Sequence, residues 1–278
     1  MSNASISATS SVGHYENFPV ASVFLPAALR DPVSVIYRFA RSADDFADEG
    51  PDQPPVRLEK LDAYRSELLR IRDGIPPRTG LFEDVARIIA AHELSLQPFL
   101  DLLDAFSQDV VKSRYQDFTE VLDYCSRSAA PVGRLMLQLY KASDELNVRQ
   151  SDAICTALQL INFWQDVAID LSKDRIYLPK DELDRFGLSE SALTAGQAGK
   201  PWHDIMRFQI ERARSMLESG APLVKRLPGR IGLELRLIVQ GGWRILEKIE
   251  AVDFDVFNHR PVLGAMDWPI LLWRAVRM

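Results

Sequence analysis

Acidic and amide side chains recur at helical spacing in one stretch, residues 159–170, which reads QLINFWQDVAID. Gln159, Asn162, Asp166 and Asp170 are separated by three, four and four positions. On an α-helix of about 3.6 residues per turn, this spacing places all four on one stripe. Almost every other position in the stretch is apolar, which is typical of a buried helix. The polar stripe is therefore expected to face a cavity or a set of polar partners.

A second acidic group ends an earlier predicted helix, residues 31–49, where Asp44, Asp45 and Asp48 fall close together. Asp44 and Asp48 are four positions apart and share the helix face that carries Arg41. Negative charge is unfavourable at a helix C-terminus, which already carries partial negative charge. A local rule broken without visible compensation is typical of a functional site.

Carboxylates in these positions require a cation, because an unpaired buried charge costs several kcal/mol. One possibility is a structural ion pair with an arginine of a neighbouring helix. The other is Mg²⁺, which favours oxygen ligands and commonly bridges carboxylates to phosphate. The chain has no Glu-x-x-His pair for a di-iron site and no glycine-rich phosphate loop. Phosphate would then be held by metal and side chains, and Arg41 and Arg175 fit that role as well as pairing with the aspartates.

Composition narrows the class of protein. The chain has 278 residues, 47% hydrophobic and 26% charged, as in ordinary globular proteins. Its net charge of −6 argues against a nucleic-acid-binding protein, which would need a basic face. Cys125 and Cys155 are expected to be free thiols in a reducing cytoplasm, and the four histidines lack zinc-ligand spacing. No apolar run reaches the length of a membrane span. Residues 1–13 are predicted to be a disordered tail, and residues 14–278 one domain.

The remaining pattern predicts only helices, so the fold class is all-α. Asp31 and Pro32 form a start signal as N-cap and first helical residue. Pro131 is expected to kink a long helix near Gly133. The expected helices cover residues 31–49, 56–72, 81–94, 97–112, 119–141, 148–171, 181–187, 189–195, 202–219, 231–251 and 262–276.

Three motifs together resemble the squalene and phytoene synthase family, over about residues 14–251. They are Arg41-x-x-Asp-Asp-x-x-Asp48, Gln159-x-x-Asn-x-x-x-Asp-x-x-x-Asp170 and Arg175-Ile-Tyr-Leu-Pro179. The resemblance implies a single-domain class I isoprenoid synthase (terpenoid synthase) bundle around a central cavity. It also implies Mg²⁺ as cofactor, held by Asp44, Asp45, Asp48, Asn162, Asp166 and Asp170.

More narrowly, residues 14–22, 124–133 and 162–167 resemble the bacterial hydroxysqualene synthase branch of hopanoid pathways. Members of that branch are lyases that convert presqualene diphosphate and water to hydroxysqualene and diphosphate. Condensing members usually have arginine where Gln165 stands and often Lys-Ser where residues 16–17 stand. Two alternatives stay open: a head-to-head synthase acting on two farnesyl diphosphates, and a non-catalytic assembly protein with the same fold.

The resemblance also implies roles for single residues. Asp44, Asp48, Asp166 and Asp170 are expected to be catalytic through the metal, and Tyr124 and Gln165 are two candidates for positioning the attacking water. The expected substrate-binding residues are Arg41, Arg175, Tyr177, Gln159, Asn162, Phe18 and Tyr37. Aromatic rings that stabilise a carbocation are expected to include Phe39 and Phe163.

The C-terminal segment, residues 267–278, combines tryptophans, aliphatic residues and arginines. It is expected to dock on the protein body, and the alternative is contact with a bilayer surface. The expected location is the cytoplasm, with peripheral contact at the inner membrane. Functional coupling to the preceding and following enzymes of squalene biosynthesis is a further expectation.

Overall fold

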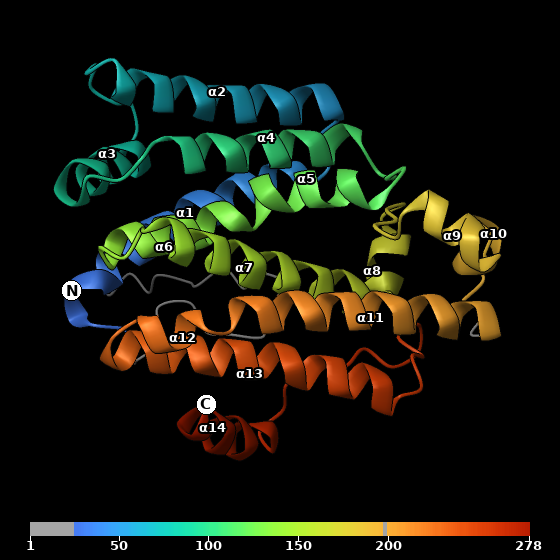
Figure 1. Ribbon diagram of the computed structural model, residues 1–278. Coiled ribbons are helices and arrows are strands. Elements are labelled where there is room, and N and C mark those ends of the chain that lie inside the picture. Colours follow the sequence, from blue (N-terminus) through green and yellow to red (C-terminus); the bar gives the residue numbers. More distant parts are fainter. Residues whose placement is uncertain (1–24, 197–198) are drawn as a thin grey trace, which may run out of the picture.

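The computed structural model describes residues 25–196 and 199–278, and this part of the chain contains α-helices and no strand (Figure 1). One isolated parallel bridge joins Arg114 to Ile176. The all-α prediction is confirmed. In the described ranges, every helix is too short or too polar to span a bilayer. The predicted tail (1–13), the motif at 14–22 and its Phe18 lie outside the described residues.

Fourteen helices are found in the described residues, most of them close to the predicted ranges. They are α1 (Ala27–Asp48), α2 (Pro54–Arg72), α3 (Gly80–His92), α4 (Gln97–Val111), α5 (Phe118–Ser128), α6 (Ala130–Leu139), α7 (Glu145–Gln165), α8 (Val167–Ser172), α9 (Lys180–Phe186), α10 (Glu190–Thr194), α11 (Lys200–Gly220), α12 (Leu223–Arg226), α13 (Gly229–Ala251) and α14 (Asp267–Arg277). In Figure 1, α2 to α4 lie along one side, α7 runs through the middle, and α11 to α14 form the other side.

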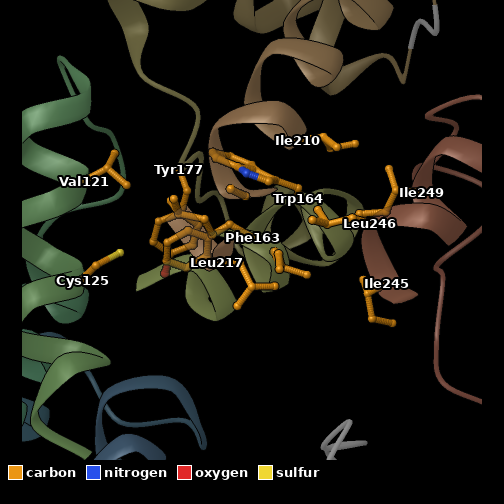
Figure 2. Packing of buried hydrophobic residues seen from close by; sticks show 14 of the residues in the cluster. Val121, Cys125, Phe163, Trp164, Tyr177, Ile210, Leu217, Ile245, Leu246 and Ile249 are labelled. Atoms are coloured by element: carbon orange, nitrogen blue, oxygen red, sulfur yellow. The ribbon is translucent and has the colours of Figure 1, made fainter. Parts of the chain in front are cut away.

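Two hydrophobic clusters fill the interior. The first is built by α1 to α4, with Leu135 and Leu139 of α6 completing it. The second is larger and surrounds α7, which contacts α5, α6, α11, α12 and α13. Figure 2 shows Phe163 and Trp164 of α7 between residues of α5 on one side and α11 and α13 on the other. The predicted burial of α7 is thus confirmed, because it is the central helix of this cluster.

The start of α1 differs from the prediction. The helix begins at Ala27 after Pro26, so Pro32 lies inside it, and Asp31 is not its N-cap. A proline close to a helix start removes a single intrahelical hydrogen bond. The helix can therefore extend upstream of Pro32.

The long helix predicted over 119–141 is two helices. α5 ends at Ser128, and Pro131 stands in the first turn of α6. Proline is favoured in that position, where its missing N–H costs nothing. Pro131 therefore starts a helix, and the predicted kink near Gly133 is wrong. A Cβ atom on Gly133 would lie 2.4 Å from Ser151 Oγ and 2.6 Å from Cys155 Sγ, so this glycine allows α6 to approach α7 closely.

The connection between α13 and α14 also differs from the prediction. Residues 262–266, expected to be helical, are not in a helix, and α14 begins at Asp267. Both cysteines are free thiols, as expected. The α13–α14 connection carries Arg260 and Pro261 toward the C-terminal end of α7.

Candidate active site

The polar stripe of residues 159–170 is divided by a helix break at Asp166. α7 ends at Gln165, α8 begins at Val167, and Asp166 has φ −106° and ψ 14°. One continuous helix was expected here, and that expectation is wrong. The Asp166 carboxylate accepts hydrogen bonds from Arg260 Nε at 2.5 Å and Nη2 at 3.2 Å. Such a bidentate pair holds the carboxylate in one orientation.

The side chain of Gln165 is held by the same connection. It is 1% exposed, and its amide nitrogen donates to the carbonyl of Pro261 at 2.5 Å. This arrangement fixes the junction of α7 and α8 against the α13–α14 connection. It does not support the expectation that Gln165 positions the attacking water.

The acidic end of α1 is neutralised by three basic side chains. Arg41 lies 3.3 Å from Asp44 and 2.7 Å from Asp45. Asp48 Oδ1 is 2.5 Å from Arg175 Nη2, and Asp48 Oδ2 is 3.2 Å from Lys173 Nζ. Arg41 and Arg175 thus pair with aspartates, one of the two roles considered for them.

The contact of Asp48 with Arg175 also brings the two acidic groups together. Arg175 and Lys173 belong to the segment directly after α8, whereas Asp48 ends α1. In both ion pairs, the basic residue and Asp48 are more than a hundred residues apart in the sequence. Asp44, Asp48, Asp166 and Asp170 therefore lie at one end of the helical bundle.

The two acidic groups differ in ionisation. Burial raises the pKa of Asp170 most, the charge of Asp166 raises it further, and the pKa reaches about 8. Burial also acts on Asp48, but its hydrogen bond and charge interaction with Arg175, together with Lys173, outweigh burial and lower its pKa. The charge of Asp48 contributes to raising the pKa of Asp170, so the two acidic groups interact electrostatically.

The donor atoms at this end of the bundle suit Mg²⁺ chemically, because they are carboxylate oxygens with an amide nearby. Asn162 is exposed and Gln159 is half-buried, both on α7. Across residues 25–196 and 199–278, no three acidic, histidine or cysteine side chains form a ready-made metal cluster. The basic side chains of Arg41, Arg175 and Arg260 hold the carboxylates instead. The raised pKa of Asp170 marks a carboxylate whose ionised form a further cation would stabilise.

Aromatic side chains cluster beside the acidic end. Phe163 and Tyr177 stack with ring centroids 3.7 Å apart and an interplanar angle of 7° (Figure 2). The ring of Tyr124 is 5.9 Å from Tyr177 and 6.1 Å from Phe163, and Tyr115 is 5.5 Å from Tyr177. Tyr124 and Tyr177 are both buried. This cluster places Tyr124, Phe163 and Tyr177 together, as a carbocation pocket would require.

Phe39, another predicted lining residue, lies elsewhere. Phe39 is fully buried in the first hydrophobic cluster, where it packs against Tyr64, Phe82 and Phe99. It is therefore a core residue and not part of the aromatic cluster. Tyr37 is half-buried on α1.

Two cavities accompany these residues. A polar cavity of about 370 Å³ lies at the acidic end and includes Asp48, Asp109, Lys173 and Arg175 in its lining. An apolar pocket of about 240 Å³ lies between α6, α7, α12 and α13. It is lined by Val132, Gly133, Met136, Leu137, Tyr140, Ser151, Ile154, Cys155, Leu158, Leu223, Leu227, Ile231, Glu234, Leu235 and Ile238.

Three residues of this region were missed by the sequence interpretation: Lys173, Arg260 and Asp109. Lys173 adjoins the Arg175 motif and could have been considered with it. Asp109 follows buried Leu102 and Phe106 of α4 at steps of four and three, so helical periodicity places a carboxylate on the buried face. Nothing in the sequence pointed to Arg260, because only the fold brings the α13–α14 connection close to Asp166.

Comparison with known proteins finds similarity along most of the chain. A hydroxysqualene synthase of Rhodopseudomonas palustris is 36% identical over 240 residues, covering 86% of this chain and 80% of the relative. A 15-cis-phytoene synthase of Synechocystis is 32% identical, covering 88% and 76%. The crystal structure of squalene synthase HpnC from Alicyclobacillus acidocaldarius superposes with a TM-score of 0.80 at 36% identity, covering 87% of this chain and 90% of that one.

A dehydrosqualene synthase structure shares the fold, with a TM-score of 0.81 at 22% identity over 92% of this chain and 89% of that one. The model of the family described as squalene/phytoene synthase matches residues 12–267, which include both acidic groups and the α13–α14 connection. With paired acidic helix ends, an adjoining aromatic cluster and this extent of similarity, the chain belongs to the squalene/phytoene synthase family.

Proposed function

We propose that this protein is a hydroxysqualene synthase, which converts presqualene diphosphate and water to hydroxysqualene and diphosphate. The main support for the proposal is that polar and apolar regions are separated along the length of α7. Carboxylates and basic side chains gather at the C-terminal end of α7, and the apolar pocket lies along its N-terminal half. Cys155 in the pocket and Asp166 are 11 residues apart, about 16 Å along a helix. A molecule with a diphosphate head and a long hydrocarbon body suits this division.

Similarity to named relatives supports the choice within the family. Hydroxysqualene synthases of three bacteria are 34 to 36% identical to this chain, and the matches cover 76 to 80% of their lengths. In this proposal the enzyme is a carbon–oxygen lyase, because the bond broken joins carbon to the diphosphate oxygen and water supplies the new hydroxyl group.

Mg²⁺ is the proposed cofactor, and it would neutralise the diphosphate as that group leaves. Asp44, Asp48, Asn162, Asp166 and Asp170 would hold it, with Asp45 supporting them. Basic side chains of the protein supply further positive charge for the diphosphate oxygens. Those at the site are Arg41, Lys173, Arg175 and Arg260.

The aromatic cluster supplies the environment for the carbocation that remains. Aromatic faces stabilise positive charge without reacting with it. Phe163, Tyr124 and Tyr177 lie beside the acidic end. The cation would therefore form next to rings that stabilise it and exclude bulk water.

Incubation of the purified enzyme with presqualene diphosphate and Mg²⁺, followed by product analysis, tests the proposal. Hydroxysqualene is the expected product. A second function, condensation of two farnesyl diphosphates, is favoured by the 30 to 33% identity to phytoene synthases. Efficient turnover of farnesyl diphosphate alone would establish that second function instead. A protein showing neither reaction and no thermal shift with Mg²⁺ plus diphosphate would be a non-catalytic assembly protein.

Peripheral contact with a membrane is a further part of the proposal. α14 docks on α13 through Leu271 and Ala275, in line with the docking expected from the sequence. Its outer face exposes Leu272, Trp273 and Val276. Such a face can rest in the interfacial region of a bilayer, where a hydrocarbon substrate and the neighbouring pathway enzymes would meet this one. Co-sedimentation with anionic vesicles, compared with a Trp273→Ser variant, tests this contact.

A further inference from the structure

Asp109 is a carboxylate of the site that the motifs of the chain do not include. It lies near the C-terminal end of α4 and lines the polar cavity together with Asp48 and Arg175. Its backbone carbonyl accepts a hydrogen bond from Arg175 Nη2 at 3.1 Å, and the same nitrogen contacts Asp48. Asp109 therefore adjoins the group of side chains assigned to the diphosphate.

The carboxylate of Asp109 is turned toward the aromatic cluster. The Tyr124 hydroxyl donates to Asp109 Oδ2 at 2.7 Å. The other oxygen, Oδ1, is buried and has no hydrogen-bond partner in the described ranges. A buried acceptor without a partner is costly and uncommon in folded proteins, and it calls for a small hydrogen-bond donor.

The hydrogen bond also defines what the Tyr124 hydroxyl can do. Because its hydrogen is directed to Asp109, the phenol oxygen presents only lone pairs to other groups. The hydroxyl oxygen of neighbouring Tyr115 already accepts a hydrogen bond from Gln108 Nε2 at 3.3 Å, so it is engaged elsewhere. Tyr124 O and Asp109 Oδ1 are then two neighbouring acceptors, and a water molecule has two hydrogens to donate.

We propose that Asp109 is a positioning residue that, with Tyr124, holds the water that captures the carbocation. This inference rests on the proposed function. With both hydrogens donated to these acceptors, the lone pair of the water oxygen is directed away from them and toward the cation. The water oxygen forms the new carbon–oxygen bond, one of its O–H bonds breaks, and that proton passes to Asp109 Oδ1. No group is oxidised or reduced, and the carboxyl later releases the proton to solvent.

The electrostatic surroundings agree with this role. Burial is the main effect on Asp109 and raises its pKa to about 7; Tyr124 and Arg175 lower it, whereas Asp48 and Asp44 raise it. Both the carboxylate and the acid form are thus accessible near neutral pH. A group that receives a proton and then releases it requires this property.

The test measures diphosphate release and product composition separately, with presqualene diphosphate and Mg²⁺. For Asp109→Asn, we expect diphosphate release within about fivefold of the unmodified enzyme. The hydroxysqualene fraction should fall at least tenfold, in favour of hydrocarbons and rearranged alcohols. Tyr124→Phe should shift the products in the same direction, and the double variant should be no worse than Asp109→Asn alone. Asp104→Asn, on the same helix and paired with Arg65, is the control and should match the unmodified enzyme.

The outcomes separate this inference from the proposed function. Equal losses of diphosphate release and hydroxysqualene, with an unchanged product ratio, would overturn the role of Asp109. If Asp109→Asn does not fold, Tyr124→Phe decides alone, because it keeps the carboxylate and removes the hydroxyl. An unmodified enzyme that does not convert presqualene diphosphate at all would overturn the proposed function, and the inference with it.

Discussion

The two acidic helix ends carry the same kind of side chain and differ in their surroundings. At the end of α1, Asp48 has two basic partners, Arg175 and Lys173, and its pKa is lowered although it is largely buried. After the α7–α8 break, Asp170 is also largely buried, and the charge of Asp166 adds to burial in raising its pKa to about 8.

The difference identifies Asp170 as the carboxylate that a cation from outside the chain, such as the proposed Mg²⁺, would stabilise. The acidic end of α1 is balanced by the protein's own arginines and lysine. The α7–α8 end has one carboxylate, Asp166, held by Arg260, and a second, Asp170, destabilised in its ionised form. Five predictions test this comparison, in order of decreasing expected effect.

Replacement of Asp170 by Asn should have the largest effect. Turnover of presqualene diphosphate should fall on the order of 10³-fold. The proposed Mg²⁺ site would lose a charged ligand beside the diphosphate, on which negative charge develops as it leaves. The exposed Asp184, which pairs with Lys180, provides the control: Asp184→Asn should keep full activity. Activity of Asp170→Asn within tenfold of the unmodified enzyme would exclude Asp170 as a metal ligand.

The Asp170→Asn substitution should also change the thermal stability of the metal-free protein. A carboxyl whose pKa is raised on folding stabilises the protein below its unfolded pKa, and that contribution is lost as pH rises toward about 8. Asn cannot ionise. The Tm of Asp170→Asn relative to the unmodified protein should therefore increase between pH 5 and pH 8, as measured by calorimetry in EDTA.

Replacement of Arg175 by Gln should lower the free energy of unfolding by about 2 kcal/mol, because Asp48 and the carbonyl of Asp109 lose a charged donor. The matched variant is Lys173→Gln. It removes the more exposed partner of Asp48 and should cost less than about 1 kcal/mol. Urea unfolding of both variants measures the difference, and equal costs would contradict the dominant role of Arg175 at this end.

The affinity for Mg²⁺ should depend on pH, because Asp170 must lose its proton to bind the metal. Below its pKa of about 8, a proton must leave before the carboxylate binds metal. The affinity is then expected to rise up to about tenfold per pH unit between pH 6 and pH 8. Titration calorimetry across this range measures it. A slope that persists unchanged in Asp170→Asn would assign the titration to another group.

Replacement of Arg260 by Gln should have the smallest effect. It frees Asp166 from a competing cation, so affinity for Mg²⁺ alone should increase roughly threefold. It also removes a part-buried ion pair, at a cost of about 1 kcal/mol in unfolding free energy. Weaker Mg²⁺ binding in this variant would show that Arg260 orients Asp166 for the metal and does not compete with it.

Sequence patterns predicted most of the fold because local periodicity and burial agree in most helices. α2, α4 and α11 were predicted within about two residues, as expected where apolar and polar faces alternate clearly. The errors occurred near prolines, at the α7–α8 break and in the α13–α14 connection. Pro32 and Pro131 are compatible with positions near a helix start, and spacing alone does not fix where that start lies.

The sequence by itself determined the all-α class, the two acidic groups and the likeness to a family, because these depend on residue type and spacing along single helices. Only the tertiary structure decided which cations hold Asp48 and Asp166, since Arg175, Lys173 and Arg260 reach these aspartates from other segments. It also decided that Gln165 faces the α13–α14 connection and that Asp109 binds Tyr124. Such contacts join residues far apart in the chain, and helical periodicity carries no information about them.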